Sequence, residues 1–130
     1  TLAKPFTEED GADSLLNPNN VKVVAGLDGR ALYFSRSPIP YMRDVPQDEW
    51  LKYHTYLKHL GIYGFRASVL RAVASLDTTP LEGAECLEQL RWLESGYRIT
   101  VAETRYASIG IDTAEDLQRA EEFINRNQLK

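Results

Sequence analysis

Arg36 is the first residue whose type and position suggest binding chemistry. It ends the run Tyr33-Phe34-Ser35-Arg36, which closes an expected strand. A guanidinium at a strand end can form two parallel hydrogen bonds to a carboxylate or a phosphate. A solvated surface arginine is the competing interpretation, and residue type alone favours it.

His59 and Tyr63 form a second candidate pair. The run from 58 to 66 predicts a strand whose alternation places both side chains on one face. The two residues then lie about 13 Å apart along the backbone, and Gly61 leaves a notch between them. This spacing suits two polar groups that reach around one sugar. The alternative is a half-buried pair that packs against a helix, and it is the more common arrangement.

Glu88 and Gln89 lie on a predicted helix that follows Pro80 and ends at Gly96. The apolar stripe of this helix faces the core and consists of Ala84, Leu87, Leu90 and Leu93. Glu88 and Gln89 are expected on the opposite side, with Glu85 and Trp92, where they are free to bind a polyol by hydrogen bonds. A plain solvated face explains them equally well.

Asp112 follows Gly110-Ile111 and precedes Thr113, at the junction between a loop and a terminal helix. Carboxylates at such junctions commonly line ligand crevices in open α/β sheets. A helix cap, worth about 1 kcal/mol, is the competing explanation for both residues. Capping and metal binding do not exclude each other.

Other catalytic signatures are missing from the sequence. It has no P-loop, no G-x-G-x-x-G motif, no zinc-ligand spacing and no prominent Cys-His or Ser-His arrangement. The single cysteine, Cys86, cannot form an intramolecular disulfide or a multi-cysteine zinc site, which fits a reducing compartment.

Composition limits the possible partners. The 130 residues carry a net charge of −4, and 43% of them are hydrophobic, which indicates one ordinary globular domain. Scattered charges offer no basic footprint, so nucleic acid is a poor candidate partner. We expect no membrane insertion, because no apolar run approaches about 20 residues. No signal peptide is recognised, and a cytoplasmic location is expected.

The elements that must position these residues alternate between strands and helices. Asp28-Gly29 separates two apolar runs, 21–27 and 31–35, and predicts a hairpin with a tight primed turn. A long aromatic segment, 37–56, follows and includes a possible short helix from Gln47 to Tyr53. Its length indicates an interface or functional excursion, or a loop that packs its own aromatic side chains.

Further elements follow the strand at 58–66. Ser68 is expected to be the N-cap of a short helix that turns Val69, Leu70 and Val73 toward the core, and residues 98–102 predict another strand. Thr113 resembles the first residue of a capping box for a terminal helix that turns Leu117, Ala120 and Phe123 or Ile124 inward. The order predicts an α/β domain with a mixed sheet.

Five stretches together resemble the 3-deoxy-manno-octulosonate (Kdo) cytidylyltransferase family over nearly the whole chain. The tyrosine-phenylalanine-serine-arginine and histidine-leucine-glycine-isoleucine-tyrosine blocks are the most specific of them. The stretches are Asn17-Pro18-Asn19 with Val21-Lys22-Val23-Val24, 31–36 with Ile39-Pro40, 58–66, 80–91, and Gly110-Ile111-Asp112-Thr113 with Glu115-Asp116-Leu117.

The resemblance implies a nucleotide-binding mixed-sheet α/β domain of the nucleotide-diphospho-sugar-transferase type. Such an enzyme works as a homodimer and transfers CMP from CTP to Kdo, with Mg²⁺ and release of pyrophosphate, for lipopolysaccharide biosynthesis. It also implies Kdo contacts at Arg36, His59, Tyr63, Glu88 and Gln89, and a magnesium ligand at Asp112. No covalent nucleophile is implied, so Cys86 is expected to be a core thiol.

The family's opening proline-alanine-arginine segment and its glutamine-glycine-aspartate motif do not occur here. We therefore expect residues 1–130 to be the C-terminal portion of one cytidylyltransferase domain. This portion would hold the Kdo-binding and dimer-forming parts but lack the N-terminal segment that binds CTP, and it is expected to be inactive alone. Two alternatives stay open: an enzyme for another acidic sugar such as a sialic acid, and a non-catalytic dimerisation or sugar-binding module.

Overall fold

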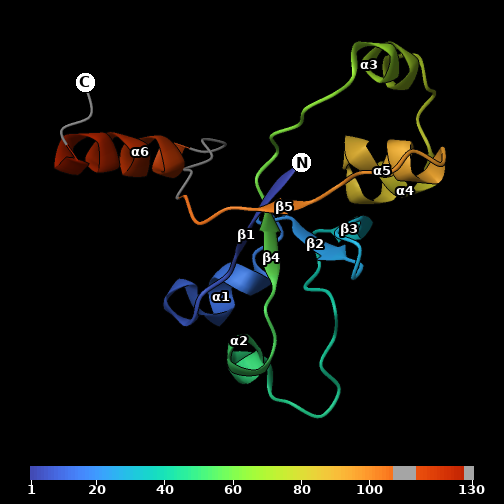
Figure 1. Ribbon diagram of the computed structural model, residues 1–130. Coiled ribbons are helices and arrows are strands. Elements are labelled where there is room, and N and C mark those ends of the chain that lie inside the picture. Colours follow the sequence, from blue (N-terminus) through green and yellow to red (C-terminus); the bar gives the residue numbers. More distant parts are fainter. Residues whose placement is uncertain (107–113, 128–130) are drawn as a thin grey trace.

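The computed structural model describes residues 1–106 and 114–127. A five-stranded sheet in the order β3-β2-β4-β1-β5 forms its centre (Figure 1). β1 (Leu2–Pro5) pairs antiparallel with β4 (Leu57–His59) and parallel with β5 (Ala102–Glu103). The sheet is therefore mixed, and the predicted α/β fold with a mixed sheet is confirmed.

β2 (Lys22–Ala25) and β3 (Ala31–Ser35) form a hairpin, as the Asp-Gly pair predicts, but the expected primed turn is wrong, because Asp28 does not have the positive φ that such a turn requires. Gly29 has a φ of 74°, a conformation that glycine adopts without a steric penalty. Val23 faces Phe34 across the hairpin, and both side chains are buried in the main core. The hairpin thus contributes one apolar face to that core.

Two clusters of buried side chains hold the fold together. The main core joins the sheet to α3 (Ala67–Ala74) and α5 (Glu88–Glu94), and its members are Ala3, Val23, Ala31, Phe34, Val73, Leu87, Leu90, Trp92 and Ile99. The second cluster contains Phe6, Leu15, Trp50 and Tyr56. It joins α1 (Gly11–Leu16) to α2 (Trp50–Tyr53). The short 3-10 helices η1 (Glu8–Asp10) and η2 (Gln47–Glu49) directly precede α1 and α2.

The aromatic segment 37–56 packs part of its own apolar surface. Trp50 is fully buried, and its indole N–H donates to the Val45 carbonyl at 2.8 Å. The hydroxyl of the buried Tyr56 donates to the Pro40 carbonyl at 2.7 Å. Tyr41 and Tyr53 remain 70% and 66% exposed. The expected short helix is confirmed, and the segment combines a self-packed centre with exposed rings.

The single helix expected between Pro80 and Gly96 is wrong. Two helices occupy this region, α4 (Pro80–Glu85) and α5, and Cys86 between them adopts the left-handed conformation with φ 52° and ψ 48°. A residue in that conformation cannot continue a right-handed helix. Cys86 is also exposed, so the expectation of a core thiol is wrong.

The strand expected over 58–66 is too long. β4 ends at His59, and Gly61 turns the chain with a φ of 69°. The next helix, α3, begins at Ala67 after its N-cap Arg66. Ser68 therefore lies inside the first turn of the helix and does not cap it.

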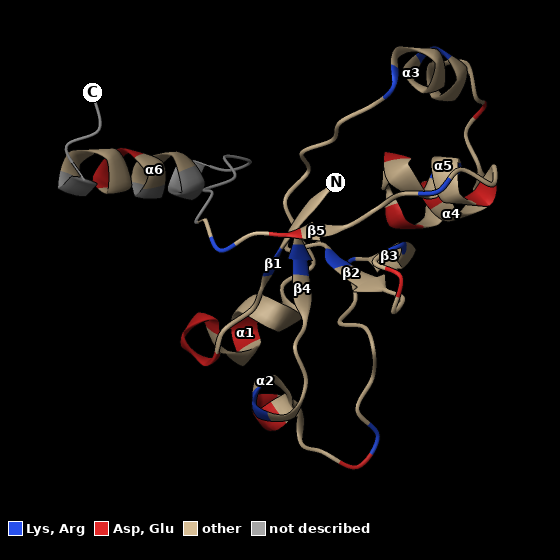
Figure 2. Ribbon diagram, in the orientation of Figure 1, with Lys and Arg blue, Asp and Glu red and all other residues tan. Residues whose placement is uncertain are grey.

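A row of lysines crosses the sheet in register. Lys4 of β1 faces Lys58 of β4, which faces Lys22 of β2 (Figure 2). Lys22 is fully buried, and its ammonium donates to the carbonyls of Asn17 and Arg36. Burial lowers the pKa of Lys22 to about 8, and the nearby Glu85 carboxylate opposes this shift.

The expected terminal helix is present as α6 (Ala114–Asn127). Ala120 is buried, but Leu117, Phe123 and Ile124 are 49%, 37% and 48% exposed, so most of the apolar face expected to turn inward is accessible. The expected cap Thr113 lies outside the described residues. Among the described helices, none has the length and apolar character that crossing a membrane requires.

Candidate functional site

His59 and Tyr63 lie against each other at the end of β4. Their ring centroids are 5.3 Å apart, and the Phe34 ring meets His59 edge to face at 5.1 Å. The separation of about 13 Å expected for a continuous strand is wrong, because the backbone turns at Gly61. The two polar side chains lie close together, as expected, but a turn at Gly61 and not a continuous strand places them so. The space beside Gly61 is open, because only its flanking residues come within 4 Å of the place where a Cβ would stand.

Burial keeps His59 neutral. It lowers the pKa of the imidazole to about 4, with a smaller contribution from the Thr1 amino group. The Gly61 N–H donates to Nε2 at 3.3 Å, which requires this nitrogen to be unprotonated. The Thr1 hydroxyl lies 3.1 Å from the same nitrogen. A neutral imidazole at this position can exchange hydrogen bonds with hydroxyl groups but carries no charge for an anion.

Tyr63 connects this end of β4 to α5. Its ring meets Trp92 edge to face, with centroids 4.9 Å apart, and stacks on Phe65 at 5.9 Å. Burial raises the pKa of the Tyr63 hydroxyl, which therefore stays protonated. The neighbouring Thr1 hydroxyl offsets part of this rise, although no hydrogen bond of ordinary geometry joins the two groups. Among the described residues, the buried Tyr63 hydroxyl has no hydrogen-bond partner.

Glu88 and Gln89 open α5, one turn before Trp92. Glu88 is exposed, as expected, and its charge raises the pKa of Tyr63. Gln89 is only 6% exposed, so the expectation that it lies on the solvent face is wrong. Because the helix breaks at Cys86, the buried face of α5 does not continue the buried face of α4. Gln89 and Trp92 are therefore turned inward with Leu90.

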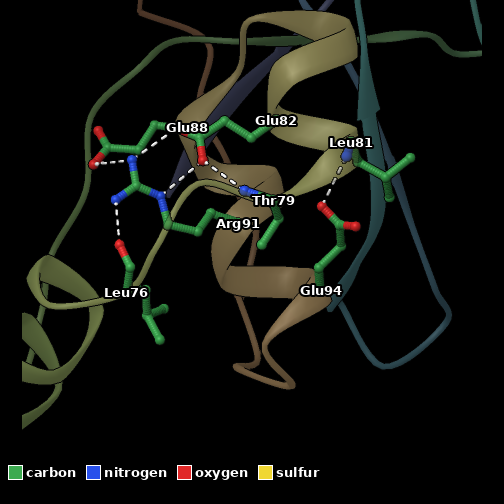
Figure 3. A network of polar contacts seen from close by, with 7 residues as sticks. All are labelled: Leu76, Thr79, Leu81, Glu82, Glu88, Arg91 and Glu94. Atoms are coloured by element: carbon green, nitrogen blue, oxygen red, sulfur yellow. Dashed lines mark hydrogen bonds and ion pairs between the residues drawn. The ribbon is translucent and has the colours of Figure 1, made fainter.

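Polar contacts clamp α4 to α5 (Figure 3). Arg91 donates from Nε and Nη2 to the two carboxylate oxygens of Glu82, at 2.8 and 2.7 Å, and from Nη1 to the Leu76 carbonyl at 2.9 Å. Its Nη2 also lies 3.6 Å from Glu88 Oε1. Glu94 accepts a hydrogen bond from the Leu81 N–H at 3.0 Å. These contacts hold Glu88 close to a fixed cation.

Arg36 lies at the end of β3 and is partly buried, so the solvated-arginine interpretation is wrong. Its guanidinium donates to three backbone carbonyls, those of Glu85 at 2.8 Å, Pro18 at 3.0 Å and Cys86 at 3.3 Å. A guanidinium has five N–H donors, so these contacts leave donors for a further acceptor.

Asp112, the expected magnesium ligand, lies outside the described residues. Within residues 1–106 and 114–127, no group of three or more His, Cys, Asp or Glu side chains could hold a metal ion. A site that rests on one or two carboxylates and on phosphate oxygens is the arrangement that Mg²⁺ usually adopts.

The sequence does not reveal two residues of this region. Its spacing places Trp92 on the outer face of a continuous helix, yet Trp92 is buried and contacts Tyr63. Glu85 carries no special signal, yet its carboxylate accepts hydrogen bonds from the Ser35 hydroxyl and the Arg36 N–H. No glycine or proline marks the break at Cys86, and so neither role can be read from spacing.

Known proteins resemble this chain along nearly its whole length. It is 53% identical over 128 residues to a 3-deoxy-manno-octulosonate cytidylyltransferase of Phocaeicola vulgatus, which covers 98% of the chain and 51% of the relative. It is 54% identical over 120 residues to the protein of the same name from Porphyromonas gingivalis, covering 92% of the chain and 47% of the relative. The chain thus spans about half the length of the curated relatives it matches.

The fold is also found in a solved structure. A CMP:2-keto-3-deoxy-manno-octonic acid synthetase complexed with CTP superposes with a TM-score of 0.82 and 36% sequence identity, over 98% of this chain and 48% of that one. Residues 2–99 match the family described as cytidylyltransferase. The match covers most of the chain and includes the hairpin, β4 and α5. This chain belongs to the cytidylyltransferase family.

Proposed function

We propose that this chain is the acidic-sugar-binding part of an enzyme that transfers CMP from CTP to Kdo, giving CMP-Kdo and pyrophosphate for lipopolysaccharide biosynthesis. Relatives about half identical to the chain carry the corresponding name, and the superposed synthetase is a complex with CTP. The proposal treats residues 1–130 as the C-terminal portion of one cytidylyltransferase domain.

The contact between Tyr63 and Trp92 carries the proposal. It packs the segment after β4 against α5, so that His59 and Tyr63 share a region with the first turn of α5, where Glu88 and Gln89 lie. The buried Tyr63 hydroxyl lacks a partner among the described residues, and buried polar groups are normally paired. A hydroxyl group of a bound sugar can supply the missing partner.

Each residue has a distinct part in this site. The remaining donors of Arg36 bind the Kdo carboxylate, neutral His59 and protonated Tyr63 bind hydroxyls, and Glu88 and Gln89 fix the sugar's orientation. The anomeric hydroxyl attacks the α-phosphorus of CTP in line, and pyrophosphate leaves from the opposite side. The protein contributes by positioning and charge neutralisation, and no side chain forms a covalent intermediate.

Magnesium and a second subunit belong to the same proposal. Asp112 would hold Mg²⁺ together with phosphate oxygens and a second carboxylate, and the ion would neutralise charge on the triphosphate. The exposed Tyr41 and Tyr53 rings offer apolar surface for a homodimer. Light scattering coupled to size exclusion tests the dimer, and a monomer at tens of micromolar would contradict it.

The decisive experiment supplies the full-length protein carrying this sequence with CTP, Mg²⁺ and one acidic sugar at a time. Pyrophosphate release with Kdo, and little release with a sialic acid, is the expected result. The reverse preference would assign the site to sialic acid. No release with either sugar, from a protein that still binds one of them by calorimetry, would indicate a non-catalytic sugar-binding module.

A further inference from the structure

Glu85 fastens the end of α4 to the end of β3. Its Oε1 accepts a hydrogen bond from the Ser35 hydroxyl at 2.6 Å, and its Oε2 accepts one from the Arg36 N–H at 2.9 Å. Hydrogen bonds to an ionised carboxylate are about twice as strong as those between neutral groups. Both carboxylate oxygens are thus engaged with β3.

Arg36 binds back in the opposite direction. Its side chain donates from Nε to the Glu85 carbonyl and from Nη2 to the Cys86 carbonyl. The two chain segments, some 50 residues apart in sequence, therefore hold each other through reciprocal contacts. We call the four residues Ser35, Arg36, Glu85 and Cys86 the β3–α4 clasp.

The β3–α4 clasp determines where α5 begins. Cys86 adopts a left-handed conformation that is uncommon outside glycine, asparagine and aspartate, so surrounding contacts must hold it. The clasp binds the carbonyl of Cys86 and the carboxylate of the preceding residue. α5 starts only two residues later, with Glu88 and Gln89 as its first members.

We propose that Glu85 is a positioning residue for the sugar site, acting through the β3–α4 clasp on Glu88 and Gln89. This inference rests on the proposed function, because it concerns the same site. Glu85 makes no contact with the sugar in this scheme, since its two oxygens are occupied by Ser35 and Arg36. Loosening the clasp shifts the first turn of α5 and weakens the sugar's hydrogen bonds.

The test uses Glu85→Gln in the full-length protein, with Kdo and CTP varied in turn. Glutamine carries no charge, so both clasp bonds become weaker bonds between neutral groups, and its single acceptor oxygen obliges the Ser35 hydroxyl to accept from the amide instead of donating. The KM for Kdo should rise about tenfold or more, while the KM for CTP changes by less than about twofold. Because Glu85→Gln can also disturb folding, Ser35→Ala is a second variant that keeps the Glu85 carboxylate; it removes the 2.6 Å contact with Glu85 and the hydrogen bond that Ser35 Oγ accepts from the Ser37 N–H. It should raise the KM for Kdo by a smaller factor.

Glu94→Gln is the matched control. Its carboxylate accepts one hydrogen bond, from the Leu81 N–H (Figure 3), and the amide oxygen of glutamine can still accept that bond, so both KM values should stay unchanged. In the double variant of Ser35 and Glu85, the two effects on the KM for Kdo should be less than additive, because both remove the same clasp.

An unchanged KM for Kdo in folded Glu85→Gln and Ser35→Ala proteins would overturn the inference. Equal increases in both KM values, accompanied by a lowered melting temperature, would also overturn it and reduce the β3–α4 clasp to a folding contact. Failure of the unmodified protein to use any acidic sugar would refute the proposed function instead, so the two failures are distinct.

Discussion

The rings of Tyr63 and Trp92 meet edge to face, with centroids 4.9 Å apart and planes inclined at 84°. Such a pair stabilises by about 0.5–1.5 kcal/mol beyond the burial of its area. It joins the turn after β4 to α5, yet the Tyr63 hydroxyl and the Trp92 indole N–H are both buried without a partner among the described residues. The contact thus positions two unpaired hydrogen-bonding groups beside the candidate sugar site.

Tyr63→Phe should show whether the Tyr63 hydroxyl serves ligand binding or the stability of the fold. No hydrogen bond is lost with this hydroxyl, so the free energy of unfolding should stay constant or rise by up to about 1 kcal/mol. Affinity for the acidic sugar should fall several-fold. Tyr56→Phe is the matched control, because its hydroxyl donates to the Pro40 carbonyl, and it should lose about 1 kcal/mol. Urea unfolding and calorimetry measure both quantities, and a comparable loss of stability in both variants would contradict the prediction.

His59 should make stability depend on pH. Its pKa in the folded protein is lowered to about 4, below the value near 6.5 expected in the unfolded chain. The unfolded state therefore binds the proton first as the pH falls. The stabilisation from neutral His59 is fully present above about pH 6.5 and is lost as the pH falls towards 4, by about 2–3 kcal/mol.

Urea unfolding at several pH values, with His59→Gln beside the unmodified protein, tests this expectation. The difference between the two curves isolates His59 from the carboxylates that titrate in the same range. Parallel curves for the unmodified protein and His59→Gln would refute the buried neutral imidazole.

The surroundings of Gly61 have room for a methyl group, but its backbone conformation disfavours any residue with a Cβ. Only the flanking residues come within 4 Å of an added Cβ, yet the φ of +69° is unfavourable for alanine, so Gly61→Ala should lower the free energy of unfolding by about 1 kcal/mol. Gly64 has equally open surroundings without a positive φ, so Gly64→Ala should cause no comparable loss. Equal effects of the two substitutions would show that the turn between His59 and Tyr63 does not depend on glycine.

Arg36→Ala should impair the use of Kdo far more than the use of CTP in the full-length protein. Loss of one charge-assisted contact to the sugar carboxylate costs about 1.5–3 kcal/mol, or roughly 10- to 150-fold in kcat/KM for Kdo. His59→Ala should show a smaller loss of the same kind. Steady-state kinetics with each substrate varied in turn measures the split, and a defect mainly in the KM for CTP would show that the assignment of Arg36 is wrong.

Asp112→Asn should abolish most activity while the fold is kept. An amide of the same shape can still cap a helix, but it is a weaker magnesium ligand than a carboxylate. Turnover of the full-length protein should fall by orders of magnitude and recover in part at high Mg²⁺. Unchanged turnover at low Mg²⁺, together with unchanged stability, would leave Asp112 with a capping role alone.

The sequence predicts those elements that side chains mark locally. Asp28-Gly29 marks the hairpin, and Pro80 marks the start of α4. The end of α4 has no such mark, because tertiary contacts impose the left-handed conformation of Cys86 and its residue type does not. If one helix continued past Cys86, its periodicity would place Gln89 and Trp92 on the solvent-exposed face. In the structure both side chains are buried.

The strand at 58–66 is overextended for a related reason. Alternation alone cannot distinguish a glycine that continues a strand from one that turns it, and Gly61 does the latter. The pairing of His59 with Tyr63 is nevertheless predicted, since both side chains reach the same region by either path. Arg36 is recognisable as a candidate from its place at a strand end, but its contacts with α4 depend on long-range packing.

Cys86 is the single cysteine of the sequence, and it is exposed at the junction between α4 and α5. A thiol-reactive fluorophore can therefore be attached there without any engineered cysteine, one residue from Glu85 and beside the carbonyl that Arg36 binds. The label would report the local environment of the junction directly while a sugar is titrated. Cys86→Gly provides the unlabelled counterpart, because glycine adopts the same left-handed conformation at lower steric cost.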